Sequence, residues 1–196
     1  MSPIALVAED KLTQAVLQKC IREILPNHWI VRSEVKGGRG NVQRELAAYA
    51  NLSKKMPVLV GVDLDGDECA PGLLAKWDQA ENLLVRVAVK EIESWVLADR
   101  RRLATFLDAP PNSLPTNPEQ LQDPKLELLK LARAHAGTEL RGDLVPRNFG
   151  QYPRIGPAYN LRMCSFVEAR WRPRVAMGHS NSLSRAIAAM ERIGAA

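Results

Sequence analysis

Short apolar runs alternate with amphipathic stretches over the first half of the chain. The runs end abruptly in charged or glycine-rich segments, as buried parallel strands do, and cover residues 4–8, 29–35, 57–62 and 83–89. Apolar side chains between them recur at helical spacing, over residues 11–25, 41–52 and 73–81. The order β-α-β-α-β-α-β predicts an α/β fold, with a Rossmann-like, mostly parallel sheet and helices on both faces.

The pattern changes after about residue 93. Asp123 and Pro124 are typical of a helix start, with Asp at the N-cap and Pro in the first helical position. Helices are predicted at 94–107, 124–135, 158–169 and 182–193, with a proline-rich stretch at 110–118 and a loop at 137–157. We therefore expect an α/β core over residues 1–98 and a helical C-terminal extension over residues 99–196 that packs on it.

Acidic side chains gather where the predicted strands end. They follow the first, third and fourth strands, as Glu9 and Asp10, then Asp63, Asp65 and Asp67, then Glu91 and Glu93. The carboxyl ends of parallel strands form the ligand-binding edge of an open sheet, so we expect these groups to converge. Asp63 and Asp65 face the same side of an extended backbone and repel each other. An oxygen-only set of this kind suits Mg²⁺ or Mn²⁺.

The third acidic cluster also has a simpler interpretation. Asp and Gly are common in turns for local backbone reasons, and residues 63–67 directly follow a predicted strand. A solvated turn would therefore have the same sequence. Acidic groups after three separate strands favour the metal site.

The ordered set of acidic motifs resembles the TOPRIM fold. Its segments are VAED after the first strand, VGVDLDGD after the third and VAVKEIESWVLAD after the fourth. That fold serves topoisomerases, primases and the overcoming-lysogenization-defect nucleases, and the chain is most similar to small stand-alone TOPRIM-like proteins. The later segments PAYN and SNSLSRAI also look like that group, so the resemblance extends over most of the chain.

The resemblance implies a metal-dependent nuclease that hydrolyses phosphodiester bonds, with Glu9, Asp63 and Asp65 as the catalytic residues. The cation would polarise a phosphoryl oxygen and generate or orient a hydroxide. The implied ligands of Mg²⁺ or Mn²⁺ are Glu9, Asp63, Asp65, Asp67, Glu91 and Glu93. Asp10 stands where the family usually has glycine, which leaves strict equivalence of that loop open. The chain has no tyrosine in a topoisomerase context and no ATPase phosphate-binding loop, so neither activity is expected of it.

Basic residues in two segments could hold nucleic acid. Lys36, Arg39 and Arg44 surround Gly37 and Gly38, and a basic, glycine-rich loop lets amides and cations approach phosphate. The second segment is Arg170-Trp171-Arg172, which mixes cations with an aromatic ring as backbone-tracking grooves do. Lys90 could neutralise a transition state or pair with a neighbouring Glu. The alternatives are a plain flexible loop and a solvated basic surface.

The composition indicates the cellular compartment and the possible classes of partner, but it does not indicate a substrate. The 196 residues include 27 Lys and Arg against 22 Asp and Glu, a net charge of +5 that permits a nucleic-acid partner. No apolar run approaches the roughly 20 residues of a membrane span, and the first residues lack a signal-peptide pattern. Three widely spaced cysteines, Cys20, Cys69 and Cys164, match no zinc or disulfide pattern. We expect a cytoplasmic protein.

Two other classes of function remain open. The chain could be a non-catalytic TOPRIM-like partner of a separately encoded ATPase, in a phage-defence or DNA-processing system. It could also be a phosphoacceptor receiver domain, which places an acidic pair after strand one and an Asp after strand three. A receiver needs a Ser or Thr after strand four, whereas this chain has Lys90 and Glu91 there.

Overall fold

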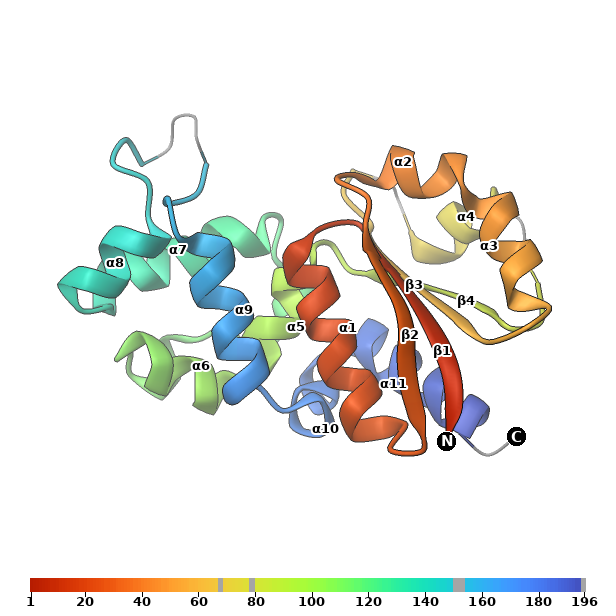
Figure 1. The fold of residues 1–196 in the computed structure, drawn as a ribbon. Helices are drawn as coiled ribbons and strands as arrows, with labels where there is room; N and C mark the ends of the chain where they lie inside the picture. Colours follow the sequence, from red (N-terminus) through yellow and green to blue (C-terminus); the bar gives the residue numbers. More distant parts are fainter. Residues whose placement is uncertain (67–68, 78–79, 150–153, 195–196) are drawn as a thin grey trace.

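A four-stranded sheet forms the centre of the protein. The structure is a computed structural model that describes residues 1–66, 69–77, 80–149 and 154–194. All four strands run parallel, in the order β2-β1-β3-β4 (Figure 1). The strands are β1 (Ser2–Ala8), β2 (His28–Val35), β3 (Val58–Asp63) and β4 (Leu83–Ala88). The predicted α/β fold with a parallel, Rossmann-like sheet is confirmed.

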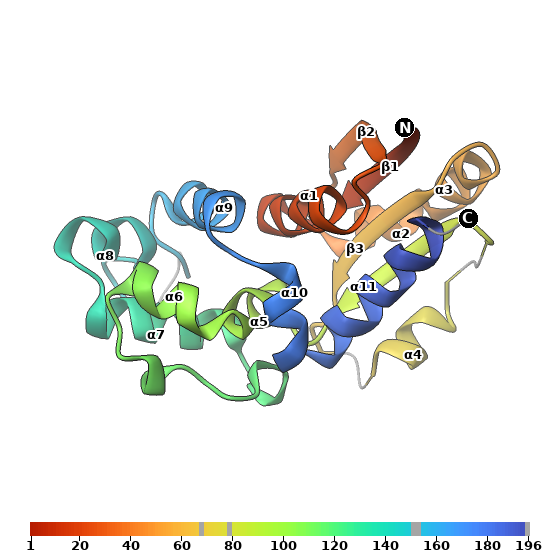
Figure 2. The same ribbon diagram turned by 90° about the horizontal axis from the view of Figure 1, so that it is seen from below.

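Helices cover both faces of this sheet. One face packs on α1 (Lys11–Ile24) and α11 (Asn181–Gly194), which lie on the same side of the strands (Figure 2). The other face packs on α2 (Arg39–Arg44), α3 (Leu46–Ser53) and α4 (Ala70–Leu74). Every residue of the central strand β3 is buried, because helices cover it from both sides.

The chain changes direction across the sheet at β1. β1 leads through α1 to β2, and β2 then leads through α2 and α3 to β3, on the other side of β1. The two connections cover opposite faces of the sheet. The segments that follow the neighbouring strands β1 and β3 therefore leave the sheet in different directions. In open parallel sheets, ligands bind at this kind of switch point. Glu9 and Asp63 lie there.

The second half of the chain is helical and packs beside the sheet (Figure 1). Its helices are α5 (Ile92–Ala98), α6 (Arg100–Leu107), α7 (Pro124–His135), α8 (Thr138–Leu144), α9 (Tyr159–Ala169) and α10 (Pro173–Ala176), with 3-10 turns at Pro111–Ser113, Pro118–Gln120 and Met177–His179. One hydrophobic cluster runs from Leu6 on β1 through Trp95 and Phe166 to Ile187 on α11. Trp95 is buried in this cluster, and α11 returns to complete the helical layer on the face of the sheet that α1 covers.

Two predicted helices are each broken into two. The predicted helix over 41–52 divides at Glu45 into α2 and α3, and the one over 94–107 divides at Asp99 into α5 and α6. Asp99 is fully buried, and its carboxylate accepts two guanidinium bonds from Arg172 (2.9 and 2.7 Å) and the Arg172 N–H (3.0 Å). A buried carboxylate needs such partners, so this contact fixes the α5–α6 break against the start of α10.

The remaining differences concern helix ends. Of the helix predicted over 73–81, residues 78–79 lie outside the described residues, and the helix observed here is α4, which begins earlier and ends at Leu74, with the N-cap Cys69 accepting a hydrogen bond from the Gly72 N–H (3.3 Å). The stretch expected to be a loop at 137–157 contains α8. The predicted helix start at Asp123 is confirmed, since its Oδ1 accepts from the Leu126 N–H (2.7 Å) at the first turn of α7.

Candidate functional site

Glu9 and Asp63 meet at the carboxyl ends of β1 and β3. The Glu9 N–H donates to the carbonyl of Gly61 (3.0 Å), which extends the β1–β3 pairing by one residue. The Asp63 N–H donates in turn to Oε2 of Glu9 (3.1 Å). The Glu9 carboxylate therefore lies against the end of β3, and the structure brings the first and third acidic clusters together.

Asp63 joins this pair to the start of α5. Its carboxylate is nearly buried, and Oδ1 accepts a hydrogen bond from the Ile92 N–H (2.8 Å) at the first residue of that helix. A carboxylate at a helix N-terminus satisfies an otherwise unpaired donor and is favoured by the helix dipole. The contact holds the Asp63 side chain at the sheet edge, next to the segment that carries Glu91 and Glu93.

Glu91 and Glu93 gather around Lys125 on α7. Glu93 is 1% exposed, and its Oε1 accepts from the Tyr159 hydroxyl (2.9 Å) and lies 3.4 Å from Nζ of Lys125. Glu91 accepts from the Lys125 N–H (3.0 Å) and lies 3.5 Å from the same Nζ. Lys125 is therefore a cation shared by two acids that follow β4.

Burial and like charge raise the pKa of the acids in this cluster. The pKa of Asp63 lies well above its ordinary range, because the carboxylate is desolvated and Glu93, Asp10 and Glu9 are near. Desolvation also raises the pKa of Glu93 to about 7, although Lys125 opposes the shift. Burial of Lys125 lowers its pKa, but the nearby carboxylates of Glu93, Glu91 and Asp63 outweigh this and raise the pKa of the lysine above its ordinary value. The cluster as a whole favours an added positive charge.

Partial burial likewise raises the pKa of Glu9, with Asp65 and Asp10 adding to the shift and hydrogen bonds from the backbone opposing it. Asp65 itself is exposed, has a left-handed backbone (φ 51°), and lies 3.8 Å from a guanidinium nitrogen of Arg39. Arg39 also donates to the carbonyls of Asp63 (3.2 Å) and Leu64 (2.8 Å). Arg39 thus holds the backbone that carries the predicted DxD pair.

The oxygen donors at this edge fit Mg²⁺ by chemistry, but they are not gathered into a ready-made metal centre. Among the residues that the structure describes, no three Asp, Glu, His or Cys side chains form a group that could hold a metal ion. Asp67, predicted as an accessory ligand, lies outside the described residues. Oε2 of Glu93 is buried and has no hydrogen-bond partner in the described structure, so the cluster retains an unsatisfied acceptor.

The predicted basic loop after β2 lies at the same edge as Glu9. The N–H groups of Gly37 (2.8 Å) and Gly38 (3.2 Å) both donate to the Glu9 carbonyl, and both glycines have positive φ. Lys36 pairs with Glu34 (3.2 Å) and Glu45 (2.7 Å). The loop is thus held by Glu9, and the charge of Lys36 is already paired with acids.

The other predicted nucleic-acid contacts have different surroundings. Arg44 donates to the Gly40 carbonyl (3.3 Å) and to Asn41 within α2. Lys90 is half-buried beside the acidic cluster, and its carbonyl accepts from the N–H groups of Leu64 and Asp65 (both 3.0 Å). These residues remain near the site.

The Arg170–Arg172 segment does not form the stacking surface that its sequence favours. Trp171 is fully buried and its ring nitrogen donates to the Trp95 carbonyl (3.1 Å). Arg172 is bonded to Asp99, while Arg170 is exposed. A stacking surface needs an accessible ring, so this segment serves packing instead.

Sequence reasoning missed Lys125 and Tyr159. Both lie in the helical half, 34 residues beyond Glu91 and 66 beyond Glu93 respectively. The Asp-Pro helix start places Lys125 in the first turn of α7, but no spacing rule brings that turn to the end of β4. A cavity of about 290 Å³ opens beside Glu91 and Lys125 and is lined by Leu126, Leu129 and Phe149, among others.

Comparisons with known proteins assign no family. No family model matches the chain, and neither a curated protein nor a solved structure matches it. None of the helices in the described ranges has the length and apolar character that a membrane crossing requires. The parallel α/β fold and the acidic cluster at its switch point are thus the observations on which function has to be argued.

Proposed function

We propose that the protein is a Mg²⁺- or Mn²⁺-dependent nuclease of the TOPRIM type. The observation that carries the proposal is the contact between Glu9 and Asp63 at the switch point of a parallel sheet. There the Asp63 N–H donates to the Glu9 carboxylate over 3.1 Å. Both carboxylates have raised pKa values, which an added cation would relieve. Perturbed acids at a sheet edge are typical of functional sites.

The residues that would hold the cation are Glu9, Asp63 and Asp65. Once bound, the ion would supply a polarised phosphoryl oxygen and an activated water. Arg39 keeps the backbone of Asp63 in position and carries a positive charge next to Asp65. Lys125 provides a second fixed cation close to Glu91 and Glu93, and a cation near the reacting phosphate would stabilise the negative charge that develops there.

Nucleic acid is the substrate that this edge would suit. Arg39 lies beside Asp65, the backbone of Lys90 is bonded to Leu64 and Asp65, and the Gly37–Gly38 turn lies next to Glu9. The cavity beside Lys125 is lined by Phe149, whose ring has the guanidinium of Arg133 over one face (4.8 Å to the centroid), so an unpaired base could stack only on the other face. A single-stranded segment could thus lie across the carboxyl ends of β1, β3 and β4.

The test is cleavage of labelled single-stranded DNA, duplex DNA and RNA in Mg²⁺ or Mn²⁺, with EDTA as a blank. Asp63→Asn and Glu9→Gln should each lower the rate at least about 100-fold, since a bound cation contributes several kcal/mol to such reactions. The matched control is Asp108→Asn, because Asp108 is exposed and its left-handed backbone accommodates Asn. Equal rates for Asp63→Asn and the wild type would exclude the proposal.

One observation favours a second candidate, a non-catalytic partner of a separate ATPase in phage defence. Asp63 already accepts the Ile92 N–H, and Glu93 already has Tyr159 and Lys125, so much of the cluster is satisfied without an ion. A protein of this class would bind its ATPase but would cleave none of the three substrates alone or in the complex. A phosphoacceptor receiver would instead form an acid-labile adduct with a small phosphodonor.

A further inference from the structure

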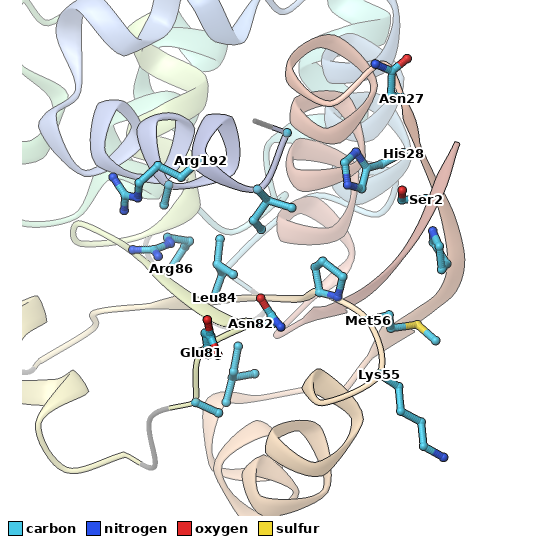
Figure 3. Close-up of a pocket in the computed structure, with 17 residues that line it drawn as sticks. Ser2, Asn27, His28, Lys55, Met56, Glu81, Asn82, Leu84, Arg86 and Arg192 are labelled. Atoms are coloured by element: carbon cyan, nitrogen blue, oxygen red, sulfur yellow. The ribbon is translucent and has the colours of Figure 1, made fainter. Parts of the chain in front are cut away.

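A large open cavity lies at the opposite end of the sheet, beside the amino ends of β1 and β4. Its volume is about 940 Å³, and it extends between the start of β1, the turn before β4 and the last turns of α11 (Figure 3). This is near the upper end of the range for small-molecule sites. Glu9 follows the carboxyl end of β1, and Asp63 ends the neighbouring parallel strand β3, so the cavity is separate from the candidate active site.

Arg86 enters this cavity from β4, where it interrupts an apolar strand. Leu84 and Ala88, two residues away on either side, belong to the core under α11, so alternation turns Arg86 to the same face. Its Nε is buried and has no hydrogen-bond partner among the described residues. A guanidinium with a buried, unpaired donor costs stability, which makes this position unusual for a strand facing a core.

A second arginine faces it. Arg192, near the end of α11, lines the same cavity, and Figure 3 shows the two guanidinium groups on the same side of it. Desolvation and the nearby charge of Arg192 lower the pKa of Arg86, and no acid contributes to that shift. Two like charges therefore lie near each other, and among the described residues no acid forms an ion pair with either arginine.

Other groups along the wall are also suited to an anion. The Nδ1 atom of His28 is buried without a partner in the described structure, and it lines the same cavity. Lys55 contributes a further positive charge, against one acid, Glu81, among the described lining residues. Two of the buried side-chain atoms that lack a hydrogen-bond partner are thus found in one hollow that is large enough for a ligand.

We propose that this cavity binds a small phosphate-bearing molecule between Arg86 and Arg192. Phosphate oxygens would accept from the buried Nε of Arg86 and from the guanidinium of Arg192, and guanidinium groups match phosphate geometry in a bidentate manner. The site is a hollow with both arginines on its wall, which favours a compact molecule over an extended nucleic-acid backbone. The proposal does not depend on the nuclease assignment.

The experiment is thermal unfolding and titration calorimetry of the full chain with inorganic phosphate, pyrophosphate, ATP and a single-stranded oligonucleotide, at constant ionic strength and in EDTA. Pyrophosphate should raise the melting temperature of the wild type. Arg86→Met and Arg192→Gln should each weaken pyrophosphate binding at least about tenfold, because each removes a charged hydrogen-bond donor. The matched control is Arg185→Gln, an exposed arginine on the same helix that does not line the cavity.

Arg86→Met should also change the stability of the free protein. In the absence of ligand it should raise the melting temperature, although it weakens pyrophosphate binding. In phosphate-free buffer this variant should melt about 2 to 4 °C above the wild type, because Met keeps the aliphatic stem and removes the unpaired charge. If pyrophosphate stabilises the wild type and Arg86→Met equally, or does not bind at all, the proposal is wrong. Binding of the oligonucleotide alone would replace the small molecule with a nucleic-acid backbone and also contradict it.

Discussion

The two ends of the same four-stranded sheet carry opposite charges, and they differ in whether the chain itself provides a partner for those charges. At the carboxyl ends, Glu9, Asp63 and Glu93 are crowded together, and the chain supplies a cation from a distant helix, Lys125. At the amino end of β4, Arg86 and Arg192 repel each other, and no acid of the described chain pairs with them. One end is partly neutralised by the fold, and the other is not.

The difference shows what each end can do. At the acidic end, Lys125 on α7 pairs with acids at the start of α5, and this ion pairing forms part of the α5–α7 contact. Substitutions that change the charge of this cluster therefore also change the stability of the fold. Two arginines whose charges lack a partner among the described residues gain no stability from ion pairing and favour an external anion. Changes at the acidic end should therefore have large effects on folding, and changes at the basic end small ones.

The largest expected effect follows the removal of the lysine. Lys125→Met should lower the free energy of unfolding by about 3 kcal/mol at pH 8, because Glu91 and Glu93 lose the cation between them while Glu93 stays buried. Urea unfolding measures the change. Lys130→Met is the matched control on the same helix, since its ion pair with Glu127 is exposed and is worth less than about 1 kcal/mol.

Adding Glu93→Gln to Lys125→Met should recover part of that loss, because the double variant no longer buries an unpaired negative charge. If Lys125→Met unfolds at the same urea concentration as the wild type at pH 8, the acidic end does not depend on its lysine. The contrast between the two ends of the sheet would then be lost.

The next effect is a pH dependence that comes from Glu93. Its pKa of about 7 in the folded protein lies above the ordinary glutamate pKa of 4.5, so over this interval the folded state binds more protons than the unfolded state. Stability should therefore decrease as the pH rises from about 4.5 to about 7, and level off above that. The decrease should be on the order of 2 kcal/mol.

Urea unfolding at pH 5 and pH 7.5, in EDTA, measures this slope. Glu93→Gln should remove most of it, and the slope that remains belongs to Asp63, whose raised pKa acts with the same sign. An identical slope in the wild type and in Glu93→Gln would contradict the prediction, because it would show that Glu93 does not titrate with a raised pKa in the folded protein.

The sequence allowed the acidic end to be predicted further than the basic end. Strand ends can be located from apolar runs, and Glu9 and Asp63 follow two of them directly, so their meeting needs only the rule that parallel strands share an edge. Lys125 could not be predicted, because its position depends on how α7 packs against α5. That packing is decided by side chains of both helices and by no local spacing.

Local patterns failed where a buried polar residue overrode them. The pattern over 94–107 predicts one helix with a basic break at residues 100–102, yet Asp99 ends one helix because its carboxylate is bound by Arg172, 73 residues later. Trp171 has the sequence context of a surface aromatic but is buried against Trp95. The apolar pattern of β4 predicts only a buried strand. The single arginine within it, Arg86, is the one local sign that this strand also borders a charged cavity.

A smaller effect is expected from the cation that the proposed function requires. Mg²⁺ at ten times its dissociation constant should stabilise the wild type by about 1.4 kcal/mol, since it binds the folded state alone. Asp63→Asn should lose this stabilisation, and Asp108→Asn should keep it, as thermal unfolding with and without EDTA can measure. Equal Mg²⁺ effects in all three proteins would remove the metal site from the acidic end.

The smallest effect is expected at the basic end, from Arg192→Gln in phosphate-free buffer. Arg192 is exposed, so removing its charge relieves repulsion of Arg86 without opening a cavity in the core, and the gain in unfolding free energy should stay below about 0.5 kcal/mol. Urea unfolding at low and high salt measures it, and the gain should fall as salt screens the two charges. A loss of stability in this variant would mean that Arg192 has a stabilising partner, and the two ends of the sheet would then resemble each other in being neutralised by the chain itself.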